Sequence, residues 1–202
     1  MIAARTRSHR TNSARMNAAT AAFAAGMLCL LAGDSTAFAP SATPGQVQEA
    51  IWSKEKWPFP IDQWGTGEAF GCASAQCGGG VHVYLRAKIG FCRCATGVSD
   101  DDEIERVGDV GLIGADYAAL APGQPVAAGI LAGRERLFRV LRPLRPPISV
   151  LEVALSNKCD AIVATVLAER DMEAAQENAA LEFLRGDIVQ HWAAANTGSR
   201  SE

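Results

Sequence analysis

The cysteines of this chain gather around one stretch of alternating residues, and that stretch constrains the fold more than any other. Residues 70–97 read FGCASAQCGGGVHVYLRAKIGFCRCATG and contain four of the six cysteines. From Val81 to Arg86, apolar and polar residues alternate with a period of two, which is typical of a half-buried strand. If residues 89–94 return as a second strand, the stretch forms a β-hairpin with cysteines at both of its ends.

The spacing of the cysteines predicts how they pair. Cys92 and Cys94 are two positions apart, so on a strand they point to the same face and are poorly placed to bond each other. They are well placed to meet Cys72 and Cys77, which predicts two nested disulfides and leaves Cys159 as a buried apolar thiol. The alternative is a zinc site made by the same four thiolates, although structural zinc usually draws on tighter C-x2-C pairs.

The cellular compartment decides between these two chemistries, because disulfides persist outside the cytoplasm and are rare within it. Residues 1–15 carry four arginines and no acid, and residues 18–32 form an apolar run that ends before Asp34. A basic start, a short apolar run and small residues are typical of a secretory signal peptide. We place cleavage after Ala37, which predicts a signal peptide over residues 1–37 and a periplasmic or secreted protein. The alternative, a retained anchor, is disfavoured because the run is shorter than the roughly 20 residues that span a bilayer.

Length and composition predict one globular domain over residues 38–202, with a flexible leader at 38–45 that is rich in Ala, Ser, Thr and Pro. Removal of residues 1–37 takes away four Arg and one Asp, so 19 basic and 22 acidic residues become 15 and 21, and the net charge is near −6. This charge argues against a nucleic-acid partner. No later segment is apolar enough to predict a stable membrane span after cleavage.

Residues 57–70, WPFPIDQWGTGEAF, predict an irregular aromatic segment, because Pro58 and Pro60 prevent a regular helix. One interpretation is a ligand-binding surface for a sugar or a peptide, continued on the polar face of the hairpin. Its candidate residues are Trp57, Trp64, His82, Tyr84 and Arg86. The other interpretation, that the rings cover the sheet edge as part of the core, is the more usual fate of large aromatics.

The second half of the chain predicts an antiparallel sheet closed by a helix. Apolar runs between Gly and Pro signals indicate strands at about 126–132, 135–141, 148–155 and 160–168. Residues 171–195 predict one long C-terminal helix, because Leu181, Leu184, Ile188 and Trp192 fall on one stripe. Before the sheet, Asp100 predicts the N-cap of a short helix. The fold class is therefore α+β, with a cysteine-rich hairpin region, an antiparallel sheet and a long C-terminal helix packed on it.

Familiar catalytic motifs are absent from the sequence: there is no C-x-x-C, H-E-x-x-H, G-x-S-x-G or nucleotide-binding glycine loop. His82 is a candidate general base, but no acid or nucleophile lies at a signature spacing from it. We therefore assign no catalytic residue and no bound cofactor beyond the alternative zinc, and the chain is more readily interpreted as a non-enzyme.

A local basic run interrupts the acidic chain. It consists of Arg134, Arg136, Arg139, Arg142 and Arg145. Such a run can contact anionic lipid headgroups or a cell-envelope polymer. It can equally form a solvated strand face whose aliphatic stems lie along the sheet.

The segment WPFPIDQWGTGEAFGC, followed by CGGGVHVYLRAKIGFCRCATGVSDDDEIERVGD, is similar to a group of uncharacterised exported proteins of alphaproteobacteria. The resemblance implies export and a folded domain, and it implies no catalytic or ligand-binding residue. Together with the preceding observations, it predicts an exported periplasmic protein, stabilised by disulfides, that acts as a binding or structural component of the cell envelope.

Overall fold

A computed structural model describes residues 51–73 and 75–198. The predicted signal peptide, its cleavage point and the leader at 38–45 lie outside these residues. Among the described residues, no helix has the length and hydropathy needed to cross a bilayer. The elements in chain order are β1 (Ser53–Glu55), β2 (Glu68–Cys72), η1 (Ala75–Cys77), β3 (Val81–Lys88), α1 (Asp101–Val107), η2 (Val110–Leu112), β4 (Asp116–Ala119), β5 (Gln124–Ala128), β6 (Leu131–Arg142), β7 (Arg145–Asn157), β8 (Asp160–Ala168), α2 (Ala174–Arg185) and α3 (Asp187–Asn196).

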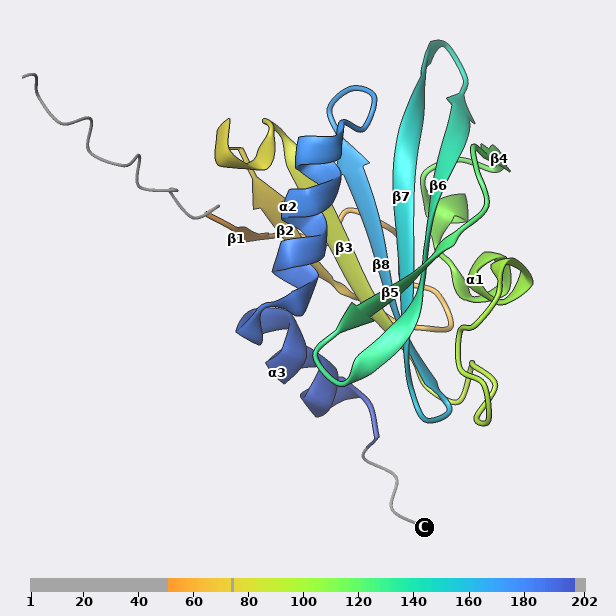
Figure 1. The fold of residues 1–202 in the computed structure, drawn as a ribbon. Coiled ribbons are helices and arrows are strands. Elements are labelled where there is room, and N and C mark those ends of the chain that lie inside the picture. The colour runs from red at the N-terminus through yellow and green to blue at the C-terminus, as the bar shows by residue number, and fades with distance from the viewer. Residues whose placement is uncertain (1–50, 74, 199–202) are drawn as a thin grey trace, which may run out of the picture. The chain divides into compact units, whose positions relative to one another are not determined.

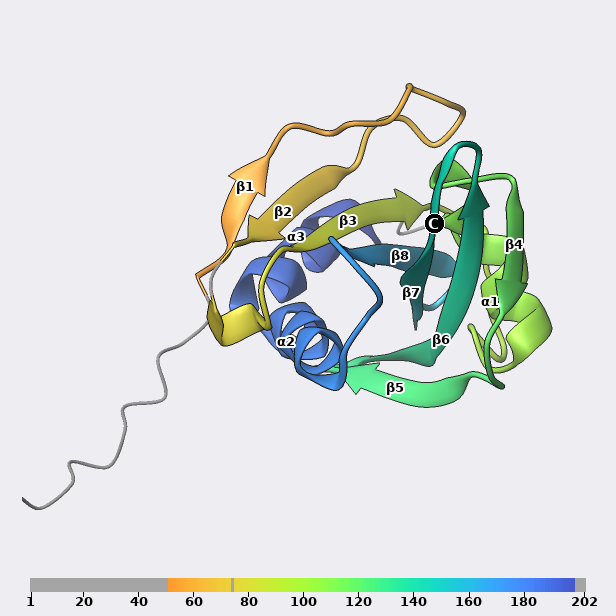
Figure 2. The same ribbon diagram turned by 90° about the horizontal axis from the view of Figure 1, so that it is seen from above.

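One eight-stranded sheet, in the order β1-β2-β3-β8-β7-β6-β4, forms the centre of the molecule (Figure 1). Neighbouring strands are antiparallel, and β6 has two partners on its outer edge: β5 along its first half and β4 along its second. Seen from above, the sheet curves around α2 and α3 (Figure 2). The predicted antiparallel sheet within an α+β fold is confirmed.

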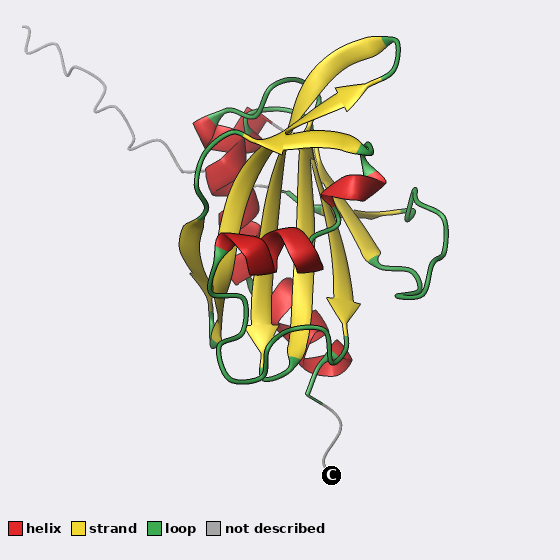
Figure 3. Ribbon diagram, turned by 90° about the vertical axis from the view of Figure 1, so that its right-hand side faces the viewer, coloured by secondary structure: helices red, strands yellow, loops and turns green. Residues whose placement is uncertain are grey.

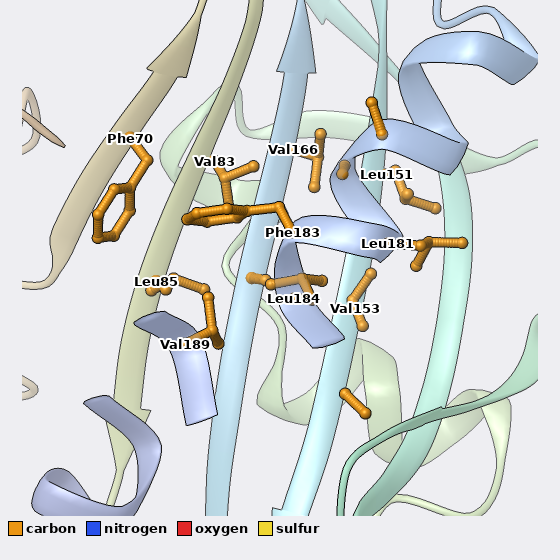
Figure 4. Close-up of a cluster of buried hydrophobic side chains, with 14 of the residues drawn as sticks. Phe70, Val83, Leu85, Leu151, Val153, Val166, Leu181, Phe183, Leu184 and Val189 are labelled. Atoms are coloured by element: carbon orange, nitrogen blue, oxygen red, sulfur yellow. The ribbon is translucent and has the colours of Figure 1, made fainter. Parts of the chain in front are cut away.

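The concave face of the sheet packs on the two C-terminal helices. Val83 of β3 lies opposite Phe70 of β2 and Val166 of β8, and all three point toward Phe183 of α2 (Figure 4). Burying an aliphatic or aromatic side chain of this kind stabilises a fold by about 1.5–3 kcal/mol. This face therefore supplies the main hydrophobic core.

The C-terminal helix is broken, and the prediction of one continuous helix is wrong. Gly186 has extended backbone angles and ends α2, after which α3 starts with a new helical phase. The core positions of α3 are consequently Val189 and Ala193. Ile188, which the continuous stripe placed in the core, is 55% exposed.

The convex face is covered by α1 and η2 (Figure 3). The irregular segment between β1 and β2 lies against β3 on the same face, where Trp57 and Phe59 contact Tyr84. Helix α1 begins as predicted, because the Asp100 side chain accepts the Glu103 N–H at 2.8 Å. Ile104 and Val107 of α1 pack with Ala154 of β7 in a second apolar cluster. Glycine lets the segment before β2 pack closely, because a Cβ at Gly67 would overlap the Leu85 carbonyl and the Trp57 ring.

The predicted hairpin around the cysteines does not form. The alternation over Val81–Lys88 does mark a strand, β3, with Val81, Val83 and Leu85 fully buried. Its partners are β2 and β8, however, whereas residues 89–99 leave the sheet as an irregular loop. The local pattern specified the strand but could not specify a partner about 80 residues away in the chain.

The strands of the second half follow the apolar runs closely. β8 spans Asp160–Ala168, and β6 and β7 extend the predicted strands to Leu131–Arg142 and Arg145–Asn157. The predicted strand at 126–132 is instead divided between β5 and the start of β6, because the chain turns at Gly129, which has a positive φ of 61°.

Candidate functional site

Strand β3 carries a row of polar side chains on the convex face, opposite the aliphatic residues of Figure 4. The row consists of His82, Tyr84, Arg86 and Lys88 and is called here the β3 polar row. His82 and Tyr84 are partly exposed, whereas Arg86 and Lys88 are 2% and 4% exposed. The row therefore runs from a solvated end to a sealed end, and the two ends have different chemistry.

Two carboxylates bracket Arg86 at the sealed end. Arg86 Nε donates to Asp109 Oδ2 at 2.8 Å and Nη2 donates to Oδ1 at 2.5 Å. Arg86 Nη1 donates to both oxygens of Asp62 at 2.8 Å. Such forked pairs are the strongest that a guanidinium makes. They join β3 to the segment between β1 and β2 and to the turn after α1.

The interactions around Arg86 favour the charged forms of Arg86 and Asp62. Burial acts to lower the pKa of Arg86, but the hydrogen bonds and charges of Asp109 and Asp62 outweigh it and raise the pKa. At Asp62, burial acts to raise the pKa, but the Trp64 N–H and the Arg86 guanidinium lower it below its ordinary value. Arg86 is therefore a permanently charged cation with its hydrogen-bonding capacity largely used.

Lys88 completes the sealed end. Its Nζ lies 2.8 Å from Asp109 Oδ1 and donates to the Val107 carbonyl at 2.6 Å. The Trp64 and Phe91 rings lie 5.7 and 5.8 Å from the same nitrogen. Rings at this distance attract a cation and shield it from water. Lys88 thus holds the end of α1 and two loops against the sheet.

A fully buried carboxyl group, Glu152 of β7, lies beneath this cluster. Its Oε1 accepts the Asp109 N–H at 2.7 Å, and Thr165 Oγ1 of β8 lies 3.1 Å from Oε2. Burial, together with the charge of Asp109, raises the pKa of Glu152 to about 8 despite these hydrogen bonds. The group is therefore protonated at neutral pH, and its proton is shielded from solvent.

The solvated end of the row joins an aromatic cluster. Trp57, Phe59 and Tyr84 contact one another edge to face, with ring centroids 4.9–6.1 Å apart. The Arg86 guanidinium lies 5.8 Å from the Trp57 ring, which links the cluster to the sealed end. Trp57 Nε1 is buried and has no hydrogen-bond partner among the residues that the structure describes. The cluster thus fastens the segment between β1 and β2 while Phe59 and Tyr84 stay partly exposed.

His82 and Glu55 form the outermost pair. His82 Nδ1 lies 2.9 Å from Glu55 Oε2, and its ring stacks parallel to Tyr84 with centroids 6.4 Å apart. Burial raises the pKa of Tyr84, and Glu55 adds to the effect, so its hydroxyl stays neutral. This end offers a hydroxyl, an imidazole and ring edges to a ligand.

The residues predicted for a binding surface fall into two groups. Trp57, His82 and Tyr84 form one continuous contact chain at the solvated end. Arg86 is too deeply buried to meet a ligand, and Trp64 packs on Phe91 at 4.5 Å beside Lys88. Asp62, Asp109 and Glu152 were not predicted. The one signal for them in the sequence is that each is an acidic residue within an apolar or turn-forming stretch.

The cysteines pair differently from the nested prediction. Cys72 bonds Cys77, and Cys94 bonds Cys159, which leaves Cys92 as the buried thiol. The nested pairing required residues 89–94 to return beside β3, and they do not. Instead Cys94 bonds to Cys159, which lies on the turn between β7 and β8. Cys92 Sγ lies 3.3 Å from the Lys158 and Asp160 carbonyls, and burial, with Glu103 and Asp160, raises its pKa.

The alternative zinc site of Cys72, Cys77, Cys92 and Cys94 is not assembled. Within residues 51–73 and 75–198, no group of three or more His, Cys, Asp or Glu side chains is placed to hold a metal ion. The four predicted ligands are divided between two disulfides and one buried thiol at different places on the sheet.

Comparisons of this chain with protein-family models, with curated proteins and with solved structures found no match.

Proposed function

We propose that this chain is an exported binding protein of the cell envelope, stabilised by two disulfides, that acts by recognition rather than by catalysis. One observation carries the proposal: the groups best suited to chemistry are already used inside the fold. Arg86, Lys88, Asp109 and Glu152 are buried and engaged with one another. A catalytic acid or base must reach a substrate atom, and these groups lie beneath loops and rings.

The disulfides support export. Four cysteines of the described domain are joined in two pairs, and disulfides are rare in the reducing cytoplasm. The apolar run at 18–32, behind four arginines, supplies a signal peptide. The resemblance to exported alphaproteobacterial proteins points the same way.

Fractionation of the producing cells tests the location. We expect the protein in the periplasmic or secreted fraction, beginning at Phe38. The intact mass should rise by four hydrogens when both disulfides are reduced. Recovery in the cytoplasm with all thiols reduced would contradict the proposal.

The solvated end of the β3 polar row is the proposed contact surface. Phe59, His82 and Tyr84 offer ring edges, an imidazole and a hydroxyl on a rigid strand and its covering loop. Pre-organised aromatic groups of this kind bind planar or apolar ligand groups at low entropic cost. Sugars and peptides are the ligand classes that this chemistry accommodates.

The tyrosines allow a sharp test of this surface. The chain has only two, Tyr84 in the row and Tyr117 on the far edge of the sheet in β4. Fluorotyrosine incorporation therefore gives two 19F NMR signals, with Tyr117 as the internal control. We expect oligosaccharides or short peptides from the cell envelope to shift the Tyr84 signal alone. Equal shifts at both tyrosines, or none across both ligand classes, would remove the surface from the proposal.

A further inference from the structure

The turn between β6 and β7 projects beyond the rest of the sheet. Its outermost residues, 141–147, are called here the hairpin tip (Figures 1 and 3). β8 pairs with β7 only from Val150 onward, and β4 reaches β6 only as far as Leu141. Beyond Leu141, no strand of the described residues other than β6 and β7 themselves pairs with the hairpin tip.

The apex residue of the hairpin tip is poorly suited to its position. Leu144 is fully exposed and has a positive φ of 59°. It follows Pro143 at the second central position of the turn, where a positive φ favours Gly or Asn. A leucine there loses backbone stability and gains no burial within the fold. Strain of this kind is retained where it serves a function outside the fold.

The only charged residues of the hairpin tip are two arginines. Arg142 and Arg145 face each other across the turn, and residues 136–151 contain no acid. Arg142 donates to the Pro146 carbonyl at 2.9 Å, and Arg145 has no ion-pair partner among the described residues. Strand pairing brings one acid, Asp116, opposite Leu141 at the base of the hairpin tip.

The other arginines of the basic run are already engaged. Arg134 pairs with Asp101, Arg136 with Glu105 at 2.5 Å, and Arg139 with Asp171 at 2.6 Å. The predicted basic run is therefore divided into a paired part on the sheet and a free part at the hairpin tip.

The backbone of the hairpin tip is unusually poor in hydrogen-bond donors. Pro143, Pro146 and Pro147 have no N–H, and the Pro146 carbonyl is occupied by Arg142. Unpaired backbone groups are the main cost of placing a turn in an apolar medium. The hairpin tip thus combines an exposed aliphatic apex, two cations and a reduced desolvation cost.

We propose that the hairpin tip docks this protein onto the surface of an anionic phospholipid bilayer, with Leu144 in the interfacial region and Arg142 and Arg145 among the headgroups. A convex, donor-poor tip enters the interface more readily than it fills a socket on a folded partner. Two arginines and one leucine give weak, reversible binding that depends on salt. The inference takes its cellular setting from the proposed envelope location, but the test below uses purified protein and can fail while export stands.

The test is co-sedimentation of the purified protein from Phe38 onward, the proposed mature form, with vesicles of phosphatidylcholine alone or mixed equally with phosphatidylglycerol. We expect a partition coefficient at least about tenfold higher on the anionic vesicles, falling as salt rises from about 0.05 M to about 0.5 M. Residues 1–37 are left out, because their four arginines and the apolar run at 18–32 would bind anionic vesicles themselves. Equal binding to both vesicle types would overturn the proposal.

Matched variants separate the hairpin tip from other exposed residues. Leu144→Asn should lower anionic-vesicle binding about tenfold, whereas Ile130→Asn, at a 93% exposed aliphatic residue at the opposite end of β6, should not change it. Arg145→Gln should lower binding about fivefold, whereas Lys158→Gln, at the opposite end of β7, should not. Thermal melting of Leu144→Asn and Leu144→Gly checks folding, since both residues accept a positive φ.

Two outcomes would assign the hairpin tip differently. If Leu144→Asn and Ile130→Asn bind as wild type does, the apex does not enter the interface. If Arg145→Gln abolishes binding to polyglutamate in solution while vesicle binding is absent, the partner is an acidic polymer. Either result would overturn docking on a bilayer.

Discussion

The face of the sheet beneath α2 and α3 is lined by aliphatic and aromatic side chains, whereas the face beneath α1 and the loops contains Arg86, Lys88 and Glu152. Adjacent residues of one strand illustrate the contrast: Leu85 is fully buried on the first face and Arg86 is 2% exposed on the second. Two regular helices can cover a sheet with apolar contacts alone. Irregular segments bring unpaired backbone groups with them, and here buried charges satisfy several of those groups.

The comparison teaches that burial alone does not identify a hydrophobic core. On the convex face, Lys88 binds the Val107 carbonyl and the protonated Glu152 accepts the Asp109 N–H, so ionisable side chains replace the hydrogen bonds that the turn after α1 does not make to itself. Each charge is paired or hydrogen-bonded, as burial requires. The convex face is therefore specific in its geometry but sensitive to the loss of any one partner.

The largest effect should come from Arg86→Met. Removal of the guanidinium leaves the buried Asp109 with Lys88 as its remaining cation, and loss of one partner of a buried pair costs about 3–5 kcal/mol. The measurement is the free energy of unfolding in urea. The control is Lys54→Met, which removes the exposed ion pair with Glu68 and should cost at most about 1 kcal/mol. An equal loss of unfolding free energy in the two variants would show that the buried pairs of Arg86 contribute no more to stability than an exposed ion pair.

The disulfides give the next comparison, because the two pairs close loops of very different lengths. Cys94–Cys159 spans 65 residues and Cys72–Cys77 spans 5. In the chain-entropy model, these loops correspond to about 4 and about 2 kcal/mol of stabilisation. We expect the Cys94→Ser/Cys159→Ser double variant to unfold at a lower urea concentration than Cys72→Ser/Cys77→Ser. The reverse order would contradict the assigned pairs.

Glu152→Gln should change the pH dependence of stability. The pKa of Glu152 is about 8 in the folded protein and near 4.5 when exposed, so the folded state holds an extra proton between these values. The contribution of this group to stability is complete below about pH 4.5 and is lost at about 1.4 kcal/mol per pH unit as pH rises to about 8. Glutamine keeps both hydrogen bonds without a charge, so Glu152→Gln should remove this slope. Parallel pH profiles for the two proteins would contradict a protonated Glu152.

The smallest change in stability should come from the hairpin tip, which packs on neither of the two helix layers. Asn adopts the positive φ of this position at lower cost than Leu does, so Leu144→Asn should stabilise the fold by about 1 kcal/mol. The melting temperature should then rise by about 3 °C. Ile130→Asn has no such strain to relieve and should leave the melting temperature unchanged. A lower melting temperature for Leu144→Asn would show that the leucine contributes to folding.

The sequence predicted β3, β6, β7 and β8 because their signal is local, whereas β1, β2 and β4 were not predicted. The alternation in β3 and the apolar run of β8 appear within fewer than ten residues. The break at Gly186 was missed because an isolated glycine is tolerated in a helix, and only the tertiary fit decides whether the chain bends there. The prediction of the hairpin was wrong for a related reason: an alternating pattern indicates a strand but does not show which strand pairs with it.

The candidate site was predicted in part. The polar alternation placed His82, Tyr84 and Arg86 on one face, and the aromatic segment did pack beside them. The partners of Arg86 could not be predicted, because Asp62 and Asp109 lie 24 and 23 residues away and reach it only through loop geometry. Cysteine pairing failed because five candidate cysteines allow 15 ways to form two bridges, and spacing alone selects none.

The most direct test of the sealed convex face is the pKa of the Glu152 carboxyl group, measured by 13C NMR of selectively labelled protein, with assignment through Glu152→Gln. If the face is sealed as described, the carboxyl carbon titrates near pH 8. A pKa below about 5, close to that of an exposed glutamate, would mean that solvent reaches the group. In that case the ionisable groups beneath α1 are accessible to water and substrates, and the convex face is not sealed from solvent as the concave face is.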